Sequence, residues 1–589
     1  MGNILDCTSN EVPRIDPTAN VPQNTDPVPS SVVIERRKPI LESCIWKLQR
    51  EYYESLTSDA AVAKSSGFTI SSNCYVARAY ANVIMSYVLD WYSNPLRTSD
   101  EPLYIIDVGA GFGKLGFLIM YHLFEMKESW PTNSQNPFIY VLTDFSQAML
   151  SYWECDPLIS QFVKMGYMDY GLLDVEHAEE LHLRRANVTL TAGCLQAPPF
   201  FLCSSVFSCI PQDVVMVDGG CVMPAILSIL QSHSSPTSVV TSNPADRYQF
   251  SWNYEEQDPV GWSNDLFSLI HKKADEGAQA IYVVPVVAVQ FIQRMQQLCE
   301  GHCAFLIADE GVFSTSELNV VRDPVLSIRG SVHLPVNYSL LEMITQQQGG
   351  FICSSSLHES FRAVLFVFGQ SQSSLTRTRL AYHNSIRTFT PESFFTFQKS
   401  VKDETALSLR GMQCLLRLSS FDPELFYRYK QLLIESCNKE TLVPSLHEDL
   451  HIDLVCVRDH TLFQNPAHDV CFELARIHMG LKEYALALEL FQDSNNCVSE
   501  HHVTWHNMGI CCFYLREFDK AKHCFMHALE LKPTYLESQV WLERITQGDV
   551  EIPSFSSGDG RLQESNTLPS HNVSEHKYGS DDMTSLHQK

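Results

Sequence analysis

The chain has 589 residues, of which 45% are hydrophobic, so it is long enough for two or three domains with buried cores. Its formal net charge of −26 argues against a protein that tracks nucleic-acid phosphates, which needs a basic face, so we expect no nucleic-acid partner. No apolar run approaches the roughly 20 residues of a transmembrane segment, and the N-terminus lacks the core of a signal peptide, so we expect a cytoplasmic protein. The 19 cysteines are scattered without a CxxC pair, which predicts reduced thiols and no metal site.

The two ends of the chain carry little that could be buried. Residues 1–40 are rich in Pro, Asn, Ser and Thr, and residues 549–589 in Ser, Gly, His and Asp, so both are predicted to be disordered tails. Gly2, with Cys7 nearby, fits an acylation signal, but Asp6 stands where N-myristoylation wants Ser or Thr. An N-terminal lipid anchor therefore remains the alternative to an ordinary tail.

Residues 41–380 are predicted to form an α/β domain. A helical pattern covers Leu41 to Tyr92, and short apolar runs then alternate with helical segments, which is typical of a parallel, doubly wound (Rossmann-like) sheet. The stretch from Ser232 to Asn264 lacks a clear period, and we expect an insertion over the sheet. The predicted strands are Tyr104–Val108, Phe138–Thr143, Phe200–Ser204, Ile281–Val284, Ala304–Ala308 and Ala363–Phe368.

Residues 390–548 are predicted to form an all-α domain with two tetratricopeptide repeats, 468–501 and 502–535. The pattern W-x-x-M-G…A-x-x-x-F-x-x-A…P, beginning at Trp505, is typical of that repeat, in which small residues let two helices approach closely. Because two repeats cannot bury a core alone, we expect a cap at Tyr535–Ile545 and shielding helices between Glu404 and Cys437. Such a module predicts a protein partner. Similar residues recur 34 positions apart in the pairs Leu474 and Met508, Ala475 and Gly509, Tyr484 and Phe518, Ala487 and Ala521, and Phe491 and Phe525.

A glycine-rich turn from Asp107 to Gly116 is the clearest functional signal, because glycines let a ligand approach the backbone at the start of a helix. A P-loop is excluded, since Leu115 follows the Gly-Lys pair where Ser or Thr is needed. The spacing of Gly111, Gly113 and Gly116 satisfies the dinucleotide fingerprint GxGxxG. The same turn also reads D-x-G-x-G-x-G from Asp107, which is motif I of class I S-adenosylmethionine (SAM) methyltransferases.

A second acid, Asp144, ends the next predicted strand. A carboxylate there can accept hydrogen bonds from both ribose hydroxyls, in SAM enzymes and in NAD enzymes alike. Asp107 favours SAM over NAD. The predicted cofactor-binding residues are Asp107, Gly109, Ala110, Gly111, Gly113, Asp144 and Phe145.

The region from Trp46 to Gly369 resembles SAM-methyltransferase-like proteins that carry C-terminal tetratricopeptide repeats. More distantly it is similar to the MidA-type family, which includes protein arginine methyltransferases of mitochondrial complex I assembly. The resemblance implies a class I methyltransferase sheet and SAM as cofactor. It rests, in chain order, on Trp46–Tyr53, Thr69–Asn73, Ala77–Ala81, Asp144–Ser146, Ile210–Asp213, Asp309–Gly311 and Gly330–Tyr338.

The chain departs from that family on the side where the methyl acceptor is expected. Ser204 and Ser208 replace an Asn and an acid, and Arg329 replaces a His. Asp213 and Asp309 are the predicted catalytic residues. The first hypothesis is a SAM-dependent methyltransferase acting on a protein or a small molecule, with a repeat module that recruits a protein. The alternatives are a catalytically degenerate, methyltransferase-like scaffold and, third, an NAD-dependent oxidoreductase.

Overall fold

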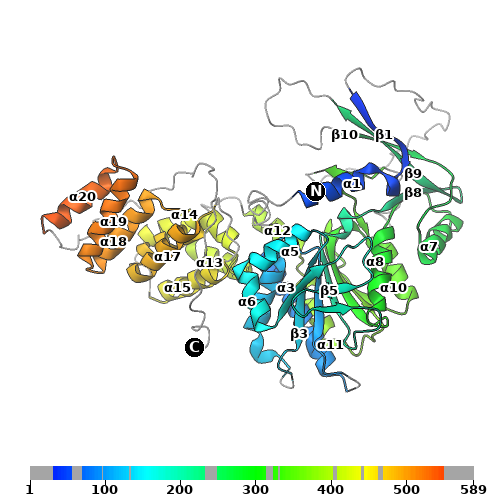
Figure 1. Cartoon of the computed structure of the whole chain (residues 1–589), viewed down its shortest axis with the longest axis horizontal. Helices are drawn as coiled ribbons and strands as arrows, with labels where there is room; N and C mark the ends of the chain where they lie inside the picture. The colour runs from blue at the N-terminus through cyan, green and yellow to red at the C-terminus, as the bar shows by residue number, and fades with distance from the viewer. Residues whose placement is uncertain are drawn as a thin grey trace, which may run out of the picture.

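The computed structural model describes residues 31–55, 69–95, 97, 99–131, 134–232, 248–313, 323–324, 326–328, 332–401, 407–439, 444–461 and 468–548. In this part of the chain an α/β domain lies beside an all-α domain (Figure 1). The predicted tail from residue 549 onward and the acylation signal at Gly2 lie outside the described residues.

The central sheet has eight strands, and seven of them follow the order β4-β3-β2-β7-β12-β17-β16. The five strands from β4 to β12 pair in parallel, and β17 runs antiparallel to both of its neighbours. Chain order reverses at β2, because β3 lies on one side of it and β7 on the other. The strands are β2 (Leu103–Val108), β3 (Phe138–Asp144), β4 (Met168–Leu172), β7 (Phe200–Ser204), β12 (Cys303–Val312), β16 (Phe351–Cys353) and β17 (Phe361–Phe368), with β15 (Val336–Asn337) paired to the end of β12.

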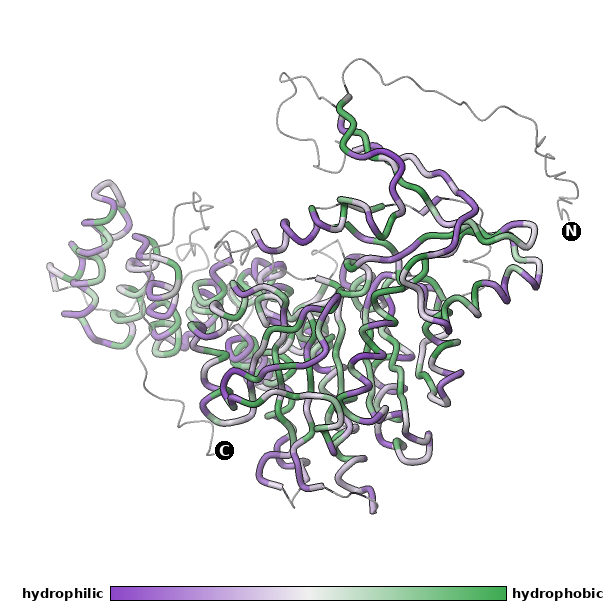
Figure 2. The backbone as a smooth tube through the Cα atoms, turned by 45° about the vertical axis from the view of Figure 1, so that its right-hand side comes forward, coloured by the Kyte–Doolittle hydropathy of each residue, from purple (hydrophilic) through white to green (hydrophobic). Residues whose placement is uncertain are grey.

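Helices cover both faces of this sheet and bury two separate hydrophobic cores. Figure 2 shows the central strands as a largely hydrophobic tube, as expected of strands that are buried on both faces. The predicted doubly wound sheet is therefore confirmed. One face carries α3 (Cys74–Tyr92), α4 (Lys114–Glu125), α5 (Gln147–Cys155), α6 (Pro157–Met165), α11 (Thr376–Tyr382) and α12 (Pro391–Ser400), and the other carries α7 (Asn264–Asp275), α8 (Val286–Gln297) and α10 (Tyr338–Gln347).

A second, antiparallel sheet was not foreseen. The predicted strand Ile281–Val284 exists, but it pairs antiparallel with β8 in this second sheet instead of joining the parallel one. Residues 31–39 form a strand on β9, so the prediction of a disordered tail over residues 1–40 is wrong for that segment, and Ile40 is fully buried. The sheet consists of β1 (Ser31–Pro39), β8 (Asp213–Asp218), β9 (Cys221–Ser232), β10 (Tyr248–Tyr254) and β11 (Ala280–Val284). Because β10 pairs with β9, the described part of the predicted insertion extends this sheet.

Several short elements connect these layers. They are η1 (Ile40–Glu42), α1 (Cys44–Glu54), η2 (Lys127–Ser129), β5 (Leu181–Leu183), β6 (Val188–Leu190), η3 (Phe207–Cys209), β13 (Ser327–Ile328), β14 (Val332–His333) and η5 (His383–Arg387). Among them, α1 packs through Ile45 and Trp46 against the second sheet. Its residues Arg50 and Gln49 contact the segments that follow β4 and β7, at Asp174 and Cys209.

The all-α domain buries a third core. Gly509 lies against Phe525, and a Cβ there would come within 2.6 Å of the ring, which is why the predicted repeat needs a small residue at this position. The predicted cap and the shielding helices are present as α20, α13 and α14. The helices are α13 (Leu409–Leu418), α14 (Pro423–Lys439), α15 (Pro444–Asp459), α16 (Val470–Gly480), α17 (Tyr484–Cys497), α18 (His502–Tyr514), α19 (Phe518–Leu531) and α20 (Leu536–Thr546).

Candidate cofactor site

The glycine turn joins β2 to α4 at the point where the strand order reverses, which is where open α/β sheets bind ligands. Gly109, Gly111 and Gly113 have φ values of +66°, +55° and +81°, a left-handed conformation that side chains with a Cβ disfavour. The amide of Ala110 donates to the carbonyl of Thr143 at 2.8 Å, which ties the turn to the neighbouring strand. The sequence motif thus forms a strand–turn–helix unit of the kind that carries a cofactor.

The glycines of the turn face different surroundings. A Cβ on Gly109 would lie 2.8 Å from Cγ2 of Val206, so the backbone is closely packed there. A Cβ on Gly111 would meet no atom within 4 Å, so one side of the turn is open. A ligand can approach the backbone at Gly111, and the turn therefore fits a bound cofactor.

Asp107 lies beneath the turn, with 2% of its surface exposed. Its Oδ2 accepts a hydrogen bond of 2.9 Å from the hydroxyl of Tyr140, and a Cβ on Gly116 would lie 3.0 Å from the same oxygen. Burial raises the pKa of Asp107 to about 7, while the Tyr140 hydrogen bond acts in the opposite direction. A cation bound nearby would favour the ionised form.

Asp144 ends β3 and contacts the turn directly. Its Oδ2 accepts a hydrogen bond from the amide of Gly111 at 3.2 Å, and its Oδ1 accepts one from Ser146 at 2.9 Å. Burial raises the pKa of Asp144, and these amide donors oppose that rise. The indole of Trp153 donates to the Gly111 carbonyl at 3.0 Å, so both backbone groups of Gly111 are held. The turn is therefore shaped before any ligand arrives.

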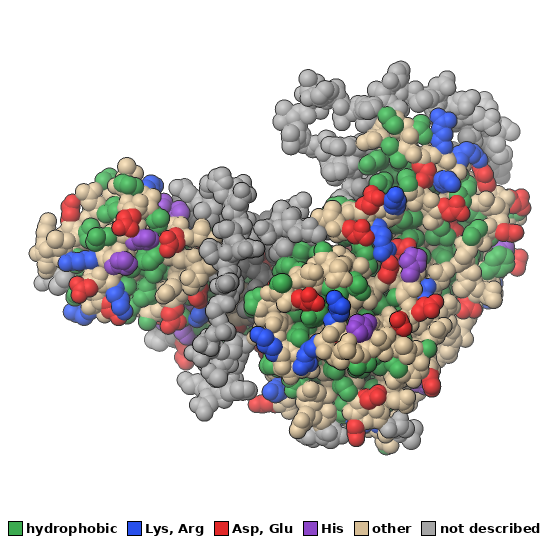
Figure 3. Space-filling view, in the orientation of Figure 1, with side chains coloured by type: hydrophobic (Ala, Val, Ile, Leu, Met, Phe, Trp, Pro, Cys, Tyr) green, Lys and Arg blue, Asp and Glu red, His purple; other side chains and the backbone are tan. Residues whose placement is uncertain are grey.

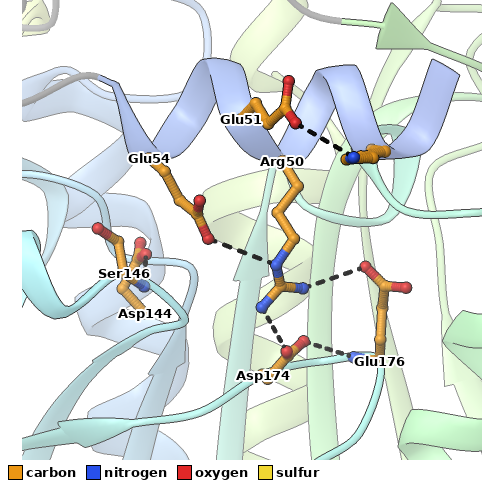
Figure 4. A network of polar contacts seen from close by, with 8 residues as sticks. Arg50, Glu51, Glu54, Asp144, Ser146, Asp174 and Glu176 are labelled. Carbon is orange, nitrogen blue, oxygen red and sulfur yellow. Dashed lines mark hydrogen bonds and ion pairs between the residues drawn. The ribbon is translucent and has the colours of Figure 1, made fainter. Parts of the chain in front are cut away.

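Helix α1 crosses above the loops that carry Asp144 and Asp174, as Figure 4 shows. Arg50 donates to Asp174 at 2.6 Å, and its guanidinium lies 4.6 Å from the ring centroid of Phe145. At the other side, Gln49 donates to the carbonyl of Cys209 at 3.1 Å. The helix is thus anchored to loops on both sides of the turn, and Arg50 covers one face of the predicted cofactor residue Phe145.

The two predicted catalytic acids occupy different places. Asp309 lies on β12, at the carboxyl ends of the parallel strands where the turn also lies. Its Oδ2 accepts a hydrogen bond from the Ser208 amide at 2.9 Å. Asp213 begins β8 in the second sheet, and its Oδ2 accepts a hydrogen bond from the Trp262 indole at 2.8 Å. They are 1% and 4% exposed, and burial raises the pKa of each to about 6. No described contact joins Asp213 to the glycine turn.

Three residues of the site were not predicted: Tyr140, Trp153 and Arg50. Tyr140 carried a signal, since a tyrosine in an otherwise apolar buried strand needs a partner for its hydroxyl. Trp153 and Arg50 act through segments distant from the turn, and nothing in their local sequence indicates that contact.

Comparison with known proteins adds a repeat family and two solved structures. Residues 502–535 match the tetratricopeptide repeat family, which confirms the second predicted repeat. One structure, from Burkholderia thailandensis, is a COG1565 superfamily member bound to S-adenosyl-homocysteine, with 11% identity, a TM-score of 0.36, and coverage of 56% of this chain and 88% of that one. A second, uncharacterised COG1565 protein from the same organism has 11% identity, a TM-score of 0.34, and coverage of 58% and 90%. Among curated proteins, none matches the chain.

The visible surface of the described residues carries charges of both signs (Figure 3). On the face in Figure 3, acidic and basic side chains are interspersed over most of the described residues, and several basic side chains gather at the upper right. Within the described residues, no helix has both the length and the apolar character that a membrane crossing requires.

Proposed function

We propose that the chain is a SAM-dependent methyltransferase whose tetratricopeptide module recruits a protein partner. The observation that carries the proposal is the open side of the turn at Gly111, bordered by the acid that ends β3. The turn resembles motif I of SAM methyltransferases, which begins with an acid. Asp107, buried beneath the turn, is that acid, and its presence supports SAM rather than NAD.

In this proposal each acid has a separate binding role. Asp144 accepts hydrogen bonds from the ribose hydroxyls with the lone pairs that Gly111 and Ser146 leave unused. Asp107 provides negative charge for the ammonium group of the cofactor. When bound, SAM supplies an electrophilic methyl group on its sulfonium.

The chain would contribute to transfer mainly by placing the acceptor in line with that methyl group. Asp309 is the better of the two predicted catalytic acids, because it lies at the same carboxyl ends of the strands as the turn. Its raised pKa of about 6 also suits a proton acceptor near neutral pH. Asp213 is better explained as an anchor of β8 through Trp262.

A second candidate function is a cofactor-binding scaffold without transfer activity. It is favoured by the burial of Asp309, whose two oxygens accept hydrogen bonds from the amides of Ser208 and Glu310. With 1% of its surface exposed, this carboxylate offers an acceptor group little access.

Calorimetric titration of the full chain with SAM, S-adenosyl-homocysteine and NAD tests the cofactor. We expect one site for SAM and S-adenosyl-homocysteine, and a loss of at least tenfold in affinity in Asp144→Asn, because a charge-assisted hydrogen bond contributes about 1.5–3 kcal/mol. Asp156→Asn is the matched control, since Asp156 also accepts two backbone hydrogen bonds but at the start of α6. Failure of the wild-type chain to bind either SAM compound would refute the proposal, and binding of NAD alone would favour the oxidoreductase.

Transfer itself needs a separate experiment. Incubation with SAM carrying a labelled methyl group and a cell extract should label an acceptor, and a variant without residues 468–548 should lose labelling if the repeats recruit a protein. Cofactor binding without any labelled acceptor would favour the scaffold.

A further inference from the structure

The buried acid Asp309 is linked to a histidine through the side chain of Ser208. The amide of Ser208 donates to Oδ2 of Asp309 at 2.9 Å, and the Ser208 hydroxyl forms a further hydrogen bond with the same carboxylate. The oxygen of this hydroxyl also lies 3.4 Å from Nδ1 of His333. Asp309, Ser208 and His333 therefore form a continuous chain of hydrogen-bonding groups.

Hydrogen bonds tie η3, which carries Ser208, to β14, which carries the histidine. The amide of Leu334, directly after β14, donates to the carbonyl of Ser208 at 2.9 Å. Gln49 on α1 bridges the same two elements, because its side-chain amide donates to the carbonyl of Cys209 at 3.1 Å and to that of Val332 at 2.8 Å. The contact between the serine and the histidine is thus fixed by the backbone on both sides.

This chain of groups borders the candidate cofactor site. Val206, two residues before Ser208, packs against the glycine turn, since its Cγ2 would lie 2.8 Å from a Cβ on Gly109. At the other end of the chain, Asp309 lies at the carboxyl ends of the parallel strands, as the turn does. A proton that moves along these groups therefore moves beside the place proposed for the cofactor.

The groups of the chain differ in their access to the surface. Asp309 and Ser208 are each 1% exposed, whereas His333 is partly exposed. An acceptor group has little access to the carboxylate but can approach the histidine. Sγ of Cys209 also lies 3.2 Å from Nδ1 of His333. Burial and the charge of Asp309 raise the pKa of that thiol to about 12, so it stays protonated and does not serve as the base.

We propose that His333 takes the proton from the methyl acceptor and that Ser208 relays a proton onward to Asp309, an inference that rests on the proposed methyl transfer. In the resting state, Nδ1–H of the neutral ring donates to the Ser208 hydroxyl, and this hydroxyl donates to the ionised Asp309. The acceptor is then a group that carries a hydrogen and loses it on methylation, such as an N–H or an O–H group.

The proton transfer conserves every hydrogen of the chain. The bond between the acceptor atom and its hydrogen breaks, its electron pair stays on the acceptor atom, and Nε2 of His333 binds the proton. Nδ1 gives its own proton to the oxygen of Ser208, and the former hydroxyl proton moves to Asp309. The ring ends neutral with its proton on Nε2, and the carboxyl group ends protonated.

The energetics and the geometry both permit this relay. Burial raises the pKa of Asp309 to about 6, close to the ordinary value of about 6.5 for imidazole, so neither end holds the proton much more tightly. The distance of 3.4 Å between Ser208 and Nδ1 exceeds the about 2.7–3.2 Å of a well-formed hydrogen bond. Catalytic hydrogen bonds commonly tighten in the reacting complex, and a movement of a few tenths of an ångström is enough here.

Other titratable groups surround the relay. They are retained in every variant of the test, so a difference between variants removes their contribution. They are Glu310 beside Asp309, Tyr80 and Tyr338, whose pKa values are raised by burial and by the charge of Asp309, Cys209 beside His333, and Tyr53, whose hydroxyl donates to Cys209.

The first test follows the His333 ring by NMR in the full chain with labelled histidine and no added cofactor. The signal of this ring is identified by its absence in His333→Gln. Asp309→Asn should lower the pH of half protonation of His333 by at least about one unit, because groups joined in one hydrogen-bonded chain titrate as a pair. In a Ser208→Ala background the same substitution should have less than about half this effect. A charge that acts only through space would not depend on the hydroxyl.

Two further variants serve as controls. Ser208→Thr keeps the hydroxyl and should keep the full coupling. Ser494→Ala removes a buried serine hydroxyl that donates to Asp469 at 2.6 Å in the all-α domain, and it should leave the His333 titration unchanged. Should Asp309→Asn fail to fold, the carboxyl carbon of Asp309 reports the coupling instead, because its titration should shift in His333→Gln and far less in the Ser208→Ala background.

The second test uses SAM with a labelled methyl group and a cell extract. His333→Gln and Ser208→Ala should each slow labelling by at least about tenfold and keep the SAM affinity within about twofold of wild type, because both residues act on the acceptor and not on the cofactor. Ser208→Thr should restore the rate.

The outcomes separate the relay from the proposed function. An unchanged labelling rate in His333→Gln would overturn the relay and leave methyl transfer intact, and so would an equal effect of Asp309→Asn with and without the Ser208 hydroxyl. A wild-type chain that binds no SAM or labels no acceptor would overturn the proposed function, and with it the role of His333.

Discussion

Substituting alanine at Gly109 and at Gly111 separates the packing of the turn from its open side. An alanine held in the left-handed backbone conformation lowers the free energy of unfolding by about 1–2 kcal/mol at either position. At Gly109 the new Cβ also lies 2.8 Å from Cγ2 of Val206, and such overpacking adds about 1–3 kcal/mol. We therefore expect Gly109→Ala to lower the free energy of unfolding by about 2–5 kcal/mol, and Gly111→Ala by about 1–2 kcal/mol.

Ligand binding should rank the two variants in the opposite order. The methyl group of Gly111→Ala occupies the open side of the turn, so SAM affinity should fall at least tenfold in a chain that remains folded. Differential scanning calorimetry measures the stability of the α/β transition, and isothermal titration measures binding. In a Val206→Ala background, the excess cost of Gly109→Ala should disappear, which a double-mutant cycle detects.

Two results would refute this reasoning. Equal destabilisation by both alanines would show that Val206 does not limit the space at Gly109. Unchanged SAM affinity in Gly111→Ala would show that the open side of the turn is not where a ligand binds.

Three further predictions concern other parts of the molecule. Asp107 has a pKa of about 7 in the folded chain and about 3.9 in the unfolded chain, so the native state binds more protons between these values. The free energy of unfolding of the wild-type chain should therefore fall as pH rises from about 4 to 7. Urea titrations across that range should show a weaker pH dependence in Asp107→Asn. Arg50→Met should lower the free energy of unfolding by at most about 1 kcal/mol but should speed amide hydrogen exchange in α1. Substituting the more exposed Lys47 by Met should leave that exchange unchanged. Gly509→Ala should lower the melting temperature of the all-α domain, because its Cβ would meet Phe525 at 2.6 Å; an unchanged calorimetric transition would contradict the close packing of α18 and α19.

Most elements of the central sheet were predictable from short-range pattern. Buried parallel strands such as β2 and β3 are continuous apolar runs, and the repeat pattern around Trp505 reports helix packing within 34 residues. The glycine turn was recognisable for the same reason, because its geometry depends on residues adjacent in the chain. The second sheet was not predictable, since β1 pairs with β9 across a long sequence separation and neither strand has a strong local signal.

The sequence by itself determined the alternation of strands and helices, the repeat, and the acids and glycines around the turn between β2 and α4. Tertiary structure alone decided which partners those acids have: Asp144 against Gly111, Asp309 against Ser208, and Asp213 against Trp262. It also brought His122 and His460 together. The physical reason is that periodicity encodes which face of an element is buried, whereas these hydrogen bonds and ring contacts depend on segments distant in the chain, and they form only when the elements pack.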